Sequence, residues 1–178
     1  MYCWKRININ KDIGRSWLYM TSFLVTLFTF SVMYIPLSIV HKVVAIQEAG
    51  ILYLFIALLF LPLVHSLMHV LPLIATKKHT RIIFKAKHGV FPFVDYYTRK
   101  YLTKWEFTFA LLAPTVFITV PGIIASYLVP GYYVYILLLT SVHIGMTFQD
   151  FLYIFHLAKA PKKAFVENGS SGIDILKK

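Results

Sequence analysis

Two histidines stand four residues apart in the segment His65-Ser66-Leu67-Met68-His69, which lies within a long apolar run. In a helix this spacing turns both imidazoles to one side, and helices supply two nitrogen ligands to zinc in this way. The spacing alone is a weak signal, because histidines that hydrogen-bond to neighbouring helices or to water show it too. We favour the metal interpretation because an apolar surrounding offers an imidazole few other partners.

A single aspartate, Asp150, borders another apolar run. A carboxylate at the centre of a membrane helix costs about 2.5–3.5 kcal/mol on insertion scales, so its presence needs a reason. At ~1.5 Å of rise per residue, His65, His69 and Asp150 fall in one layer near the carboxyl ends of their expected helices. Asp150 would then complete a His-His-Asp metal site with a fourth position open, as in catalytic zinc centres.

His143 precedes Asp150 by seven residues, which is close to two helical turns. It therefore shares the helix face of Asp150 but lies ~10 Å deeper along the axis. We interpret His143 as a candidate relay or as an outer hydrogen-bond partner of the site. An ordinary packed polar residue fits the pattern equally well.

The composition indicates the surroundings that must position these groups. The chain has 178 residues, of which 58% are hydrophobic and 14% charged, with a net charge of +11. Soluble domains have about 45–50% apolar and about 25% charged residues, so an ordinary soluble domain and a disordered tail are both excluded. Nucleic-acid binding is not expected, because no recognised binding module accompanies the basic charge. The chain is expected to be a small multi-pass membrane protein.

Three stretches carry no Asp, Glu, Lys or Arg: 16–41, 49–76 and 107–149. A membrane-spanning helix needs about 20 apolar residues, so the first two stretches hold one span each and the third holds two. The third stretch folds back at Val129-Pro130-Gly131. Buried helices of a soluble bundle are disfavoured because they average only about 11–12 residues. We predict four spans in one domain covering 1–178, near 17–40, 49–75, 107–128 and 132–157.

The basic residues predict the orientation of these spans. Residues 1–16 hold four Lys or Arg, the loop 42–48 one, the loop 76–106 eight, the turn 129–131 none and the tail 158–178 five. Basic loops remain on the cytoplasmic side. We therefore expect both termini and the central loop to face the cytoplasm of a cell membrane, with an uncleaved first span.

Two short hairpins are expected outside the spans. In the central loop, residues 81–97 alternate weakly around a turn signal at His88-Gly89, which predicts a β-hairpin at the membrane face. The tail repeats the pattern around Asn168–Gly172. Thr103 and Glu106 match the capping box that begins a helix. The predicted fold class is an all-α membrane protein of four transmembrane helices, with a short β-hairpin in the cytoplasmic loop between the second and third helices.

Several motifs together resemble a bacterial family of small integral-membrane proteins described as zincin-like metallopeptidases. The motifs are the histidine pair, Cys3–Ile9, Leu111-Leu112-Ala113-Pro114, Gln149-Asp150-Phe151 and Ala164-Phe165-Val166-Glu167. The family is similar in motif placement to the intramembrane site-2 proteases. The resemblance implies zinc as the metal, His65 and His69 as ligands and Asp150 as the third ligand. It also implies that the 81–97 hairpin holds an extended substrate by strand addition.

One position departs from the zincin pattern HExxH, in which the glutamate is the general base. Ser66 occupies that position here. A neutral hydroxyl does not accept a proton as a carboxylate does, and loss of a general base typically costs 10²–10⁴-fold in rate. A degenerate metallopeptidase is therefore expected.

The alternative is a non-catalytic pseudoprotease or scaffold that binds a membrane partner. A metal or ion carrier is less favoured, because four spans provide little pathway without oligomerisation. The expected partners are the lipid bilayer and a membrane-protein or peptide substrate.

Overall fold

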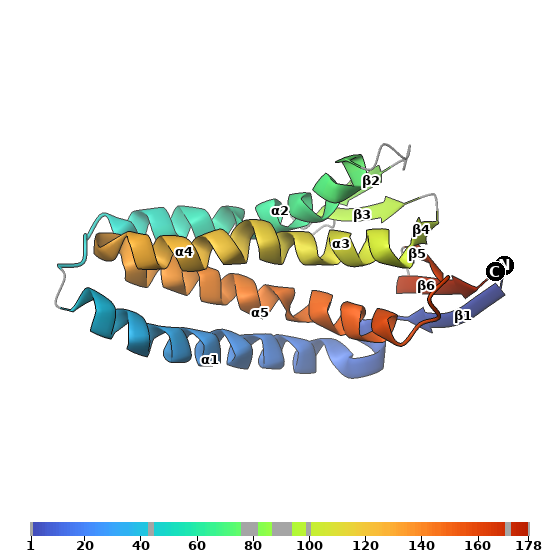
Figure 1. Ribbon diagram of the computed structural model, residues 1–178, viewed down its shortest axis with the longest axis horizontal. Coiled ribbons are helices and arrows are strands. Elements are labelled where there is room, and N and C mark those ends of the chain that lie inside the picture. Colours follow the sequence, from blue (N-terminus) through green and yellow to red (C-terminus); the bar gives the residue numbers. More distant parts are fainter. Residues whose placement is uncertain are drawn as a thin grey trace.

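The computed structural model describes residues 2–42, 45–75, 82–86, 94–98, 101–169 and 172–177. In this part of the chain, long helices lie side by side along the length of the molecule, and a small sheet lies at one end (Figure 1). Both termini are found at the sheet end. The arrangement confirms a helical membrane-type bundle with an antiparallel sheet outside it.

Among the residues that the structure describes, four helical segments are long and apolar enough to cross a membrane, as the uncharged stretches predict. They are α1 (Arg15–His41), α2 (Gly50–Ala75), a third segment built from α3 (Lys104–Pro114), the π-helical turn η2 (Thr115–Thr119) and α4 (Val120–Leu128), and α5 (Tyr133–Ala158). Short turns, η1 (Asn10–Gly14) and η3 (Pro130–Tyr132), precede α1 and α5. The chain is therefore a multi-pass membrane protein by the length and composition of its helices.

The third segment begins at Lys104, earlier than the expected start near 107. The predicted capping box is present: the Glu106 N–H donates to Thr103 Oγ1 at 3.3 Å, and the Thr103 N–H donates to Glu106 Oε2 at 2.9 Å. These two hydrogen bonds satisfy amide groups that a helix end otherwise leaves unpaired. The carboxylate of Glu106 is thereby engaged at the helix start.

Small residues bring α5 close to its neighbours. A Cβ added to Gly145 of α5 would meet Thr26 Oγ1 and would lie 2.6 Å from the backbone oxygen of Ser22, both on α1. A Cβ added to Gly122 of α4 would meet the side chain of Thr140 on α5. Membrane helices associate through such small-residue contacts because lipid provides no hydrophobic driving force between them. Close packing on two sides encloses the polar face of α5.

The small sheet joins the two ends of the described chain. Its strands are β1 (Tyr2–Ile7), β4 (Leu102–Thr103), β5 (Phe165–Gly169) and β6 (Gly172–Lys177), in the antiparallel order β1-β6-β5-β4. The β5–β6 pair, with Gly169 opposite Gly172, confirms the hairpin expected in the tail. The sequence analysis did not predict strand β1, and treated Cys3–Ile9 only as a motif. Val166 and Ile175 are completely buried beneath the sheet.

An ion pair ties β1 to β6. The Arg6 guanidinium donates two hydrogen bonds to the Asp174 carboxylate, at 2.6 and 2.8 Å. Hydrogen bonding to Arg6 lowers the pKa of the Asp174 carboxyl below its usual value of 3.8. Because the folded-state pKa is lowered, the pair contributes stability above the ordinary aspartate range and loses it as the pH falls through the lowered pKa.

The central loop contributes a second, two-stranded sheet. Strands β2 (Ile82–Ala86) and β3 (Val94–Thr98) pair antiparallel, with Ile82 opposite Thr98 and Ala86 opposite Val94. This pairing agrees with the hairpin expected over 81–97. The expected turn at His88-Gly89 lies outside the described residues, and the cytoplasmic placement of the hairpin stays a prediction.

Candidate metal centre

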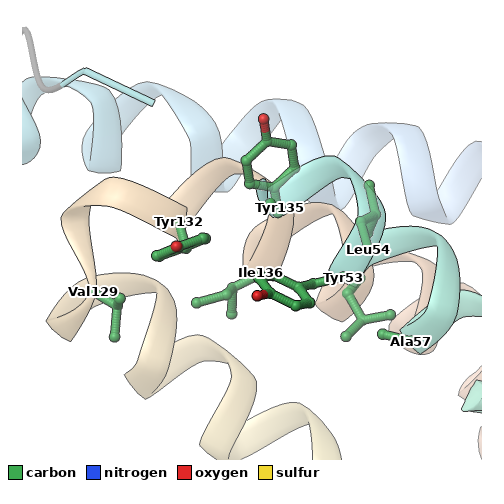
Figure 2. Close-up of a pocket in the computed structure, with 9 residues that line it drawn as sticks. Tyr53, Leu54, Ala57, Val129, Tyr132, Tyr135 and Ile136 are labelled. Atoms are coloured by element: carbon green, nitrogen blue, oxygen red, sulfur yellow. The ribbon is translucent and has the colours of Figure 1, made fainter. Parts of the chain in front are cut away.

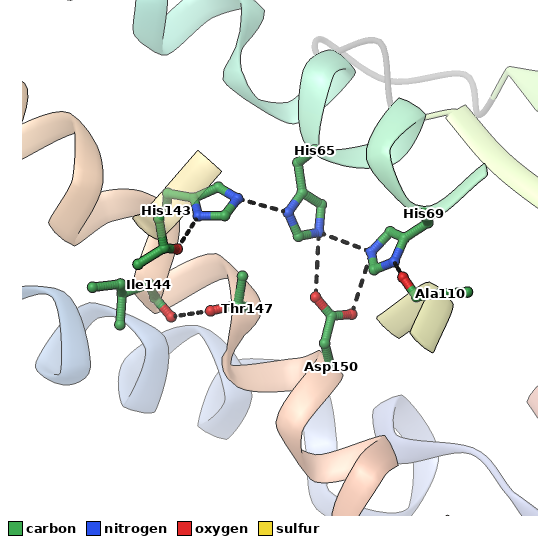
Figure 3. A network of polar contacts seen from close by, with 8 residues as sticks. His65, His69, Ala110, His143, Ile144, Thr147 and Asp150 are labelled. Atoms are coloured by element: carbon green, nitrogen blue, oxygen red, sulfur yellow. Dashed lines mark hydrogen bonds and ion pairs between the residues drawn. The ribbon is translucent and has the colours of Figure 1, made fainter. Parts of the chain in front are cut away.

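The histidine pair of α2 and the aspartate of α5 meet inside the bundle (Figure 3). His65 Nε2 lies 3.5 Å from Asp150 Oδ2, and His69 Nε2 lies 3.5 Å from Asp150 Oδ1. The two Nε2 atoms are 3.2 Å apart. The structure thus brings together the three residues that the sequence analysis selected from two distant segments.

These spacings fit a single metal ion. Ligands around a tetrahedral zinc lie at about 2.0–2.1 Å from the metal, which places neighbouring ligand atoms about 3.3–3.4 Å apart. The two nitrogens are 3.2 Å apart, and each lies 3.5 Å from a different oxygen of Asp150, which is close to that edge length. With one ligand atom taken from each residue, all three atoms lie within 4.8 Å of one another. The His-His-Asp group could therefore hold a metal ion.

The electrostatics of Asp150 point the same way. Asp150 is 9% exposed, and its Oδ2 atom is buried without a hydrogen-bond partner among the described residues. An ionised carboxylate in an apolar interior is costly unless it is paired or coordinates a metal. A cation between Asp150 and the imidazoles would supply the missing partner of this oxygen.

Each histidine also contacts a partner on its far side. His69 Nδ1 donates to the backbone oxygen of Ala110 on α3, at 2.8 Å. His65 Nδ1 lies 3.2 Å from His143 Nε2, and His143 Nδ1 lies 2.8 Å from Thr119 Oγ1. His143 is fully buried. It contacts His65 directly, and its role as a relay or an outer partner stays a prediction.

Two of these contacts were missed by sequence reasoning. The Ala110 carbonyl is a backbone group, and its only signal was Pro114, four residues further along the same helix. Thr119 ends the π-helical turn η2, and nothing in the local sequence distinguishes it from other threonines of the spans. Ser66, next to His65 on α2, is only half-buried.

An apolar pocket of about 330 Å³ lies elsewhere in the bundle (Figure 2). It is formed near the beginning of α2, by Tyr53, Leu54 and Ala57, against Tyr135 and Ile136 of α5. His65 and His69 lie near the opposite end of α2. The pocket is therefore separate from the polar cluster, and the His-His-Asp group is the better candidate for chemistry.

Comparison with known proteins supports this assignment. A family model described as "Putative zincin peptidase" matches residues 58–165, which is more than half of the chain and includes both histidines and Asp150. No curated protein and no solved structure matches the chain significantly. The chain belongs to this zincin peptidase family.

Proposed function

We propose that the protein is a membrane-embedded zinc metallopeptidase-like protein of the cell membrane, in which hydrolysis is weakened or lost. His65, His69 and Asp150 hold the zinc, and Ser66 takes the place of the general base. The observation that carries the proposal is the convergence of two imidazole nitrogens, 3.2 Å apart, and one carboxylate, whose two oxygens each lie 3.5 Å from one of these nitrogens, from two membrane-type helices. Family membership supports the peptidase-like character.

Two imidazole nitrogens and one carboxylate oxygen form a donor set typical of catalytic zinc, which keeps one position open. Zinc bound there would polarise a scissile carbonyl and lower the pKa of a water molecule. The protein's part is to hold the donors in place and to limit water. His69 and Asp150 are 6% and 9% exposed, so the bundle shields the site from bulk solvent.

The missing element is a base that could take a proton from water. Glu106 is engaged in the capping box of α3, and Glu48 precedes α2, at the end away from His65. Asp150 could act as a base only by leaving the metal. Among the described residues, no other carboxylate replaces the absent glutamate, and this favours a weakly active or inactive member of the family.

The alternative within the same architecture is a pseudoprotease or scaffold that binds a membrane partner or peptide without cutting it. Ser66 is the observation that favours it. The paired strands β2 and β3 would offer a backbone edge to an extended segment of a membrane-protein partner. In either case the lipid bilayer surrounds the protein. The outer faces of α1 and α2 are apolar, with Phe28 and Phe55 exposed, as contact with lipid requires.

The charge pattern supports a cytoplasmic location for both termini. β1 and β6 pair with each other, so the two termini lie at one end of the bundle (Figure 1). Basic residues are concentrated in the sequence before α1, between α2 and α3 and after α5, whereas the loop before α2 and the turn before α5 carry a single basic residue between them. By the positive-inside rule, the sheet end faces the cytoplasm.

Zinc content tests the metal centre. Protein purified in detergent, loaded with zinc and freed of excess metal should carry one zinc per chain by atomic emission. His65→Ala, His69→Ala and Asp150→Asn should each reduce this to a small fraction, because each removes one of three ligands. His41→Ala is the matched control: its buried imidazole contacts the Ser126 carbonyl at 3.0 Å, outside the cluster. Absence of zinc from the wild type, or an equal loss in the control, would contradict the assignment.

Restoring the carboxylate tests the role of Ser66. Zinc-loaded wild type and Ser66→Glu are reconstituted in liposomes with labelled single-span membrane peptides. Cleavage by Ser66→Glu should exceed that by the wild type by about 10²–10⁴-fold, the typical value of a general base. Ser66→Gln and the double variant His65→Ala/Ser66→Glu should not cut. Equal cleavage by wild type and Ser66→Glu would refute the role given to Ser66, and cleavage by neither would remove the support for hydrolysis.

The single cysteine, Cys3, tests the orientation, since it is exposed on β1. A membrane-impermeant maleimide should label Cys3 only after spheroplasts are permeabilised. In a Cys3→Ser background, Gln47→Cys, an exposed position between α1 and α2, should be labelled in intact spheroplasts. The reverse pattern would place the termini outside.

A further inference from the structure

The third membrane-type segment, α3–η2–α4, provides the far-side contacts of both histidines. Ala110 belongs to α3 and Thr119 is the last residue of η2. Each of the two groups lies beside an irregularity of this helix, a proline in one case and a π-helical turn in the other.

The first irregularity is Pro114. In a regular α-helix, the Ala110 carbonyl would accept the N–H of residue 114, but proline has no N–H. The next amide, that of Thr115, donates to the Leu112 oxygen and not to the Ala110 oxygen. The Ala110 carbonyl is therefore left to accept from His69 Nδ1, at 2.8 Å. A carbonyl oxygen only accepts, so His69 carries its proton on Nδ1, and the Nε2 lone pair is directed at Asp150.

The second irregularity is η2, in which the Val120 N–H donates to the Thr115 oxygen five residues earlier. Such π-helical turns frequently occur at functional sites. Thr119, at the end of η2, is buried and lies 2.8 Å from His143 Nδ1. His143 Nε2 in turn lies 3.2 Å from His65 Nδ1. Thr119 thus ends a chain of polar contacts that begins at the metal centre.

This chain has two consistent hydrogen-bond directions, because a hydroxyl both donates and accepts. In one direction, the Thr119 O–H donates to His143, His143 Nε2–H donates to His65, and His65 carries its proton on Nε2. In the other, His65 Nδ1–H donates to His143 Nε2, and His143 Nδ1–H donates to Thr119 Oγ1. Each ring carries one proton in both cases. Only the second direction leaves the His65 Nε2 lone pair free for a metal.

We propose that Thr119, acting through His143, and Pro114, acting through the Ala110 carbonyl, are positioning residues that set the metal-binding tautomers of His65 and His69. The proposal rests on the proposed metal centre. Outer hydrogen-bond partners of this kind fix both the tautomer and the orientation of a ligand imidazole. Here, one irregular helix supplies both partners to a histidine pair on another helix.

Zinc affinity, measured by competition with a chromophoric chelator, tests the proposal. Thr119→Val keeps the shape of the side chain but removes the acceptor, and Pro114→Ala provides an N–H that competes with His69 for the Ala110 carbonyl. Each should weaken zinc binding by about 10–100-fold, the range typical of outer partners. Thr119→Ser should bind like the wild type. Thr147→Val is the matched control, because the Thr147 hydroxyl donates only within α5, to the Ile144 oxygen at 2.9 Å.

Two further measurements separate positioning from damage to the fold. The metal-free Pro114→Ala protein should melt close to the wild type, because the backbone hydrogen bond that its helix gains offsets the contact that His69 loses. Nitrogen-15 spectra of the zinc-loaded wild type should show His65 and His143 protonated on Nδ1, and Thr119→Val should alter both signals. Unchanged affinity in Thr119→Val and Pro114→Ala, or an equal loss in Thr147→Val, would overturn the proposal. Absence of zinc from the wild type would instead refute the metal centre itself.

Discussion

A carboxylate enclosed by membrane-type helices is the constraint on which the arrangement depends. Asp150 lies on the buried face of α5, where water is scarce and an unpaired oxygen is costly. Its surroundings must therefore contain a cation or donors. The two imidazoles of α2 face it from the opposite side. Close packing of α1 at Gly145 and of α4 at Gly122 encloses the same helix and limits the entry of water.

The far-side contacts of the histidines follow from the same constraint. Buried imidazole nitrogens need partners as much as buried oxygens do. Ala110 satisfies His69, and His143 with Thr119 satisfies His65. Among the described residues, Asp150 Oδ2 has no hydrogen-bond partner, and His65 Nε2 lies 3.5 Å from it. This arrangement supports the proposed metal centre.

Much of this architecture could be predicted from the sequence because the signals are local. The uncharged stretches predicted the four spans, and helical periodicity predicted that both histidines lie on one face of a helix. A shared depth brought Asp150 into their layer. Strand β1 escaped prediction because it pairs with β6, at the other end of the chain, and pairing at such separations leaves no local pattern. The role of the Ala110 carbonyl was not predicted, because backbone groups are the same in every residue and Pro114, four residues further on, was its only signal.

His143 shows that the helical rise between two residues does not by itself decide whether they belong to one site. Seven residues of rise place it well away from Asp150, and the sequence analysis left open whether it belonged to the site. The structure shows that His65 bridges the gap, because its ring contacts Asp150 through one nitrogen and His143 through the other. The two nitrogens of the His65 ring thus connect Asp150 and His143, which lie about two helical turns apart on α5. Residues two helical turns apart on α5 can therefore belong to one polar cluster.

The central claim is that one metal ion is held by two imidazoles and a carboxylate. X-ray absorption spectroscopy of the zinc-loaded protein tests it most directly, because it reports the atoms around the metal. The account predicts about four nitrogen or oxygen neighbours at about 2.0–2.1 Å, with outer scattering from two imidazole rings. A sulfur neighbour at about 2.3 Å, which Cys3 would have to provide, or scattering from fewer than two imidazoles would contradict it.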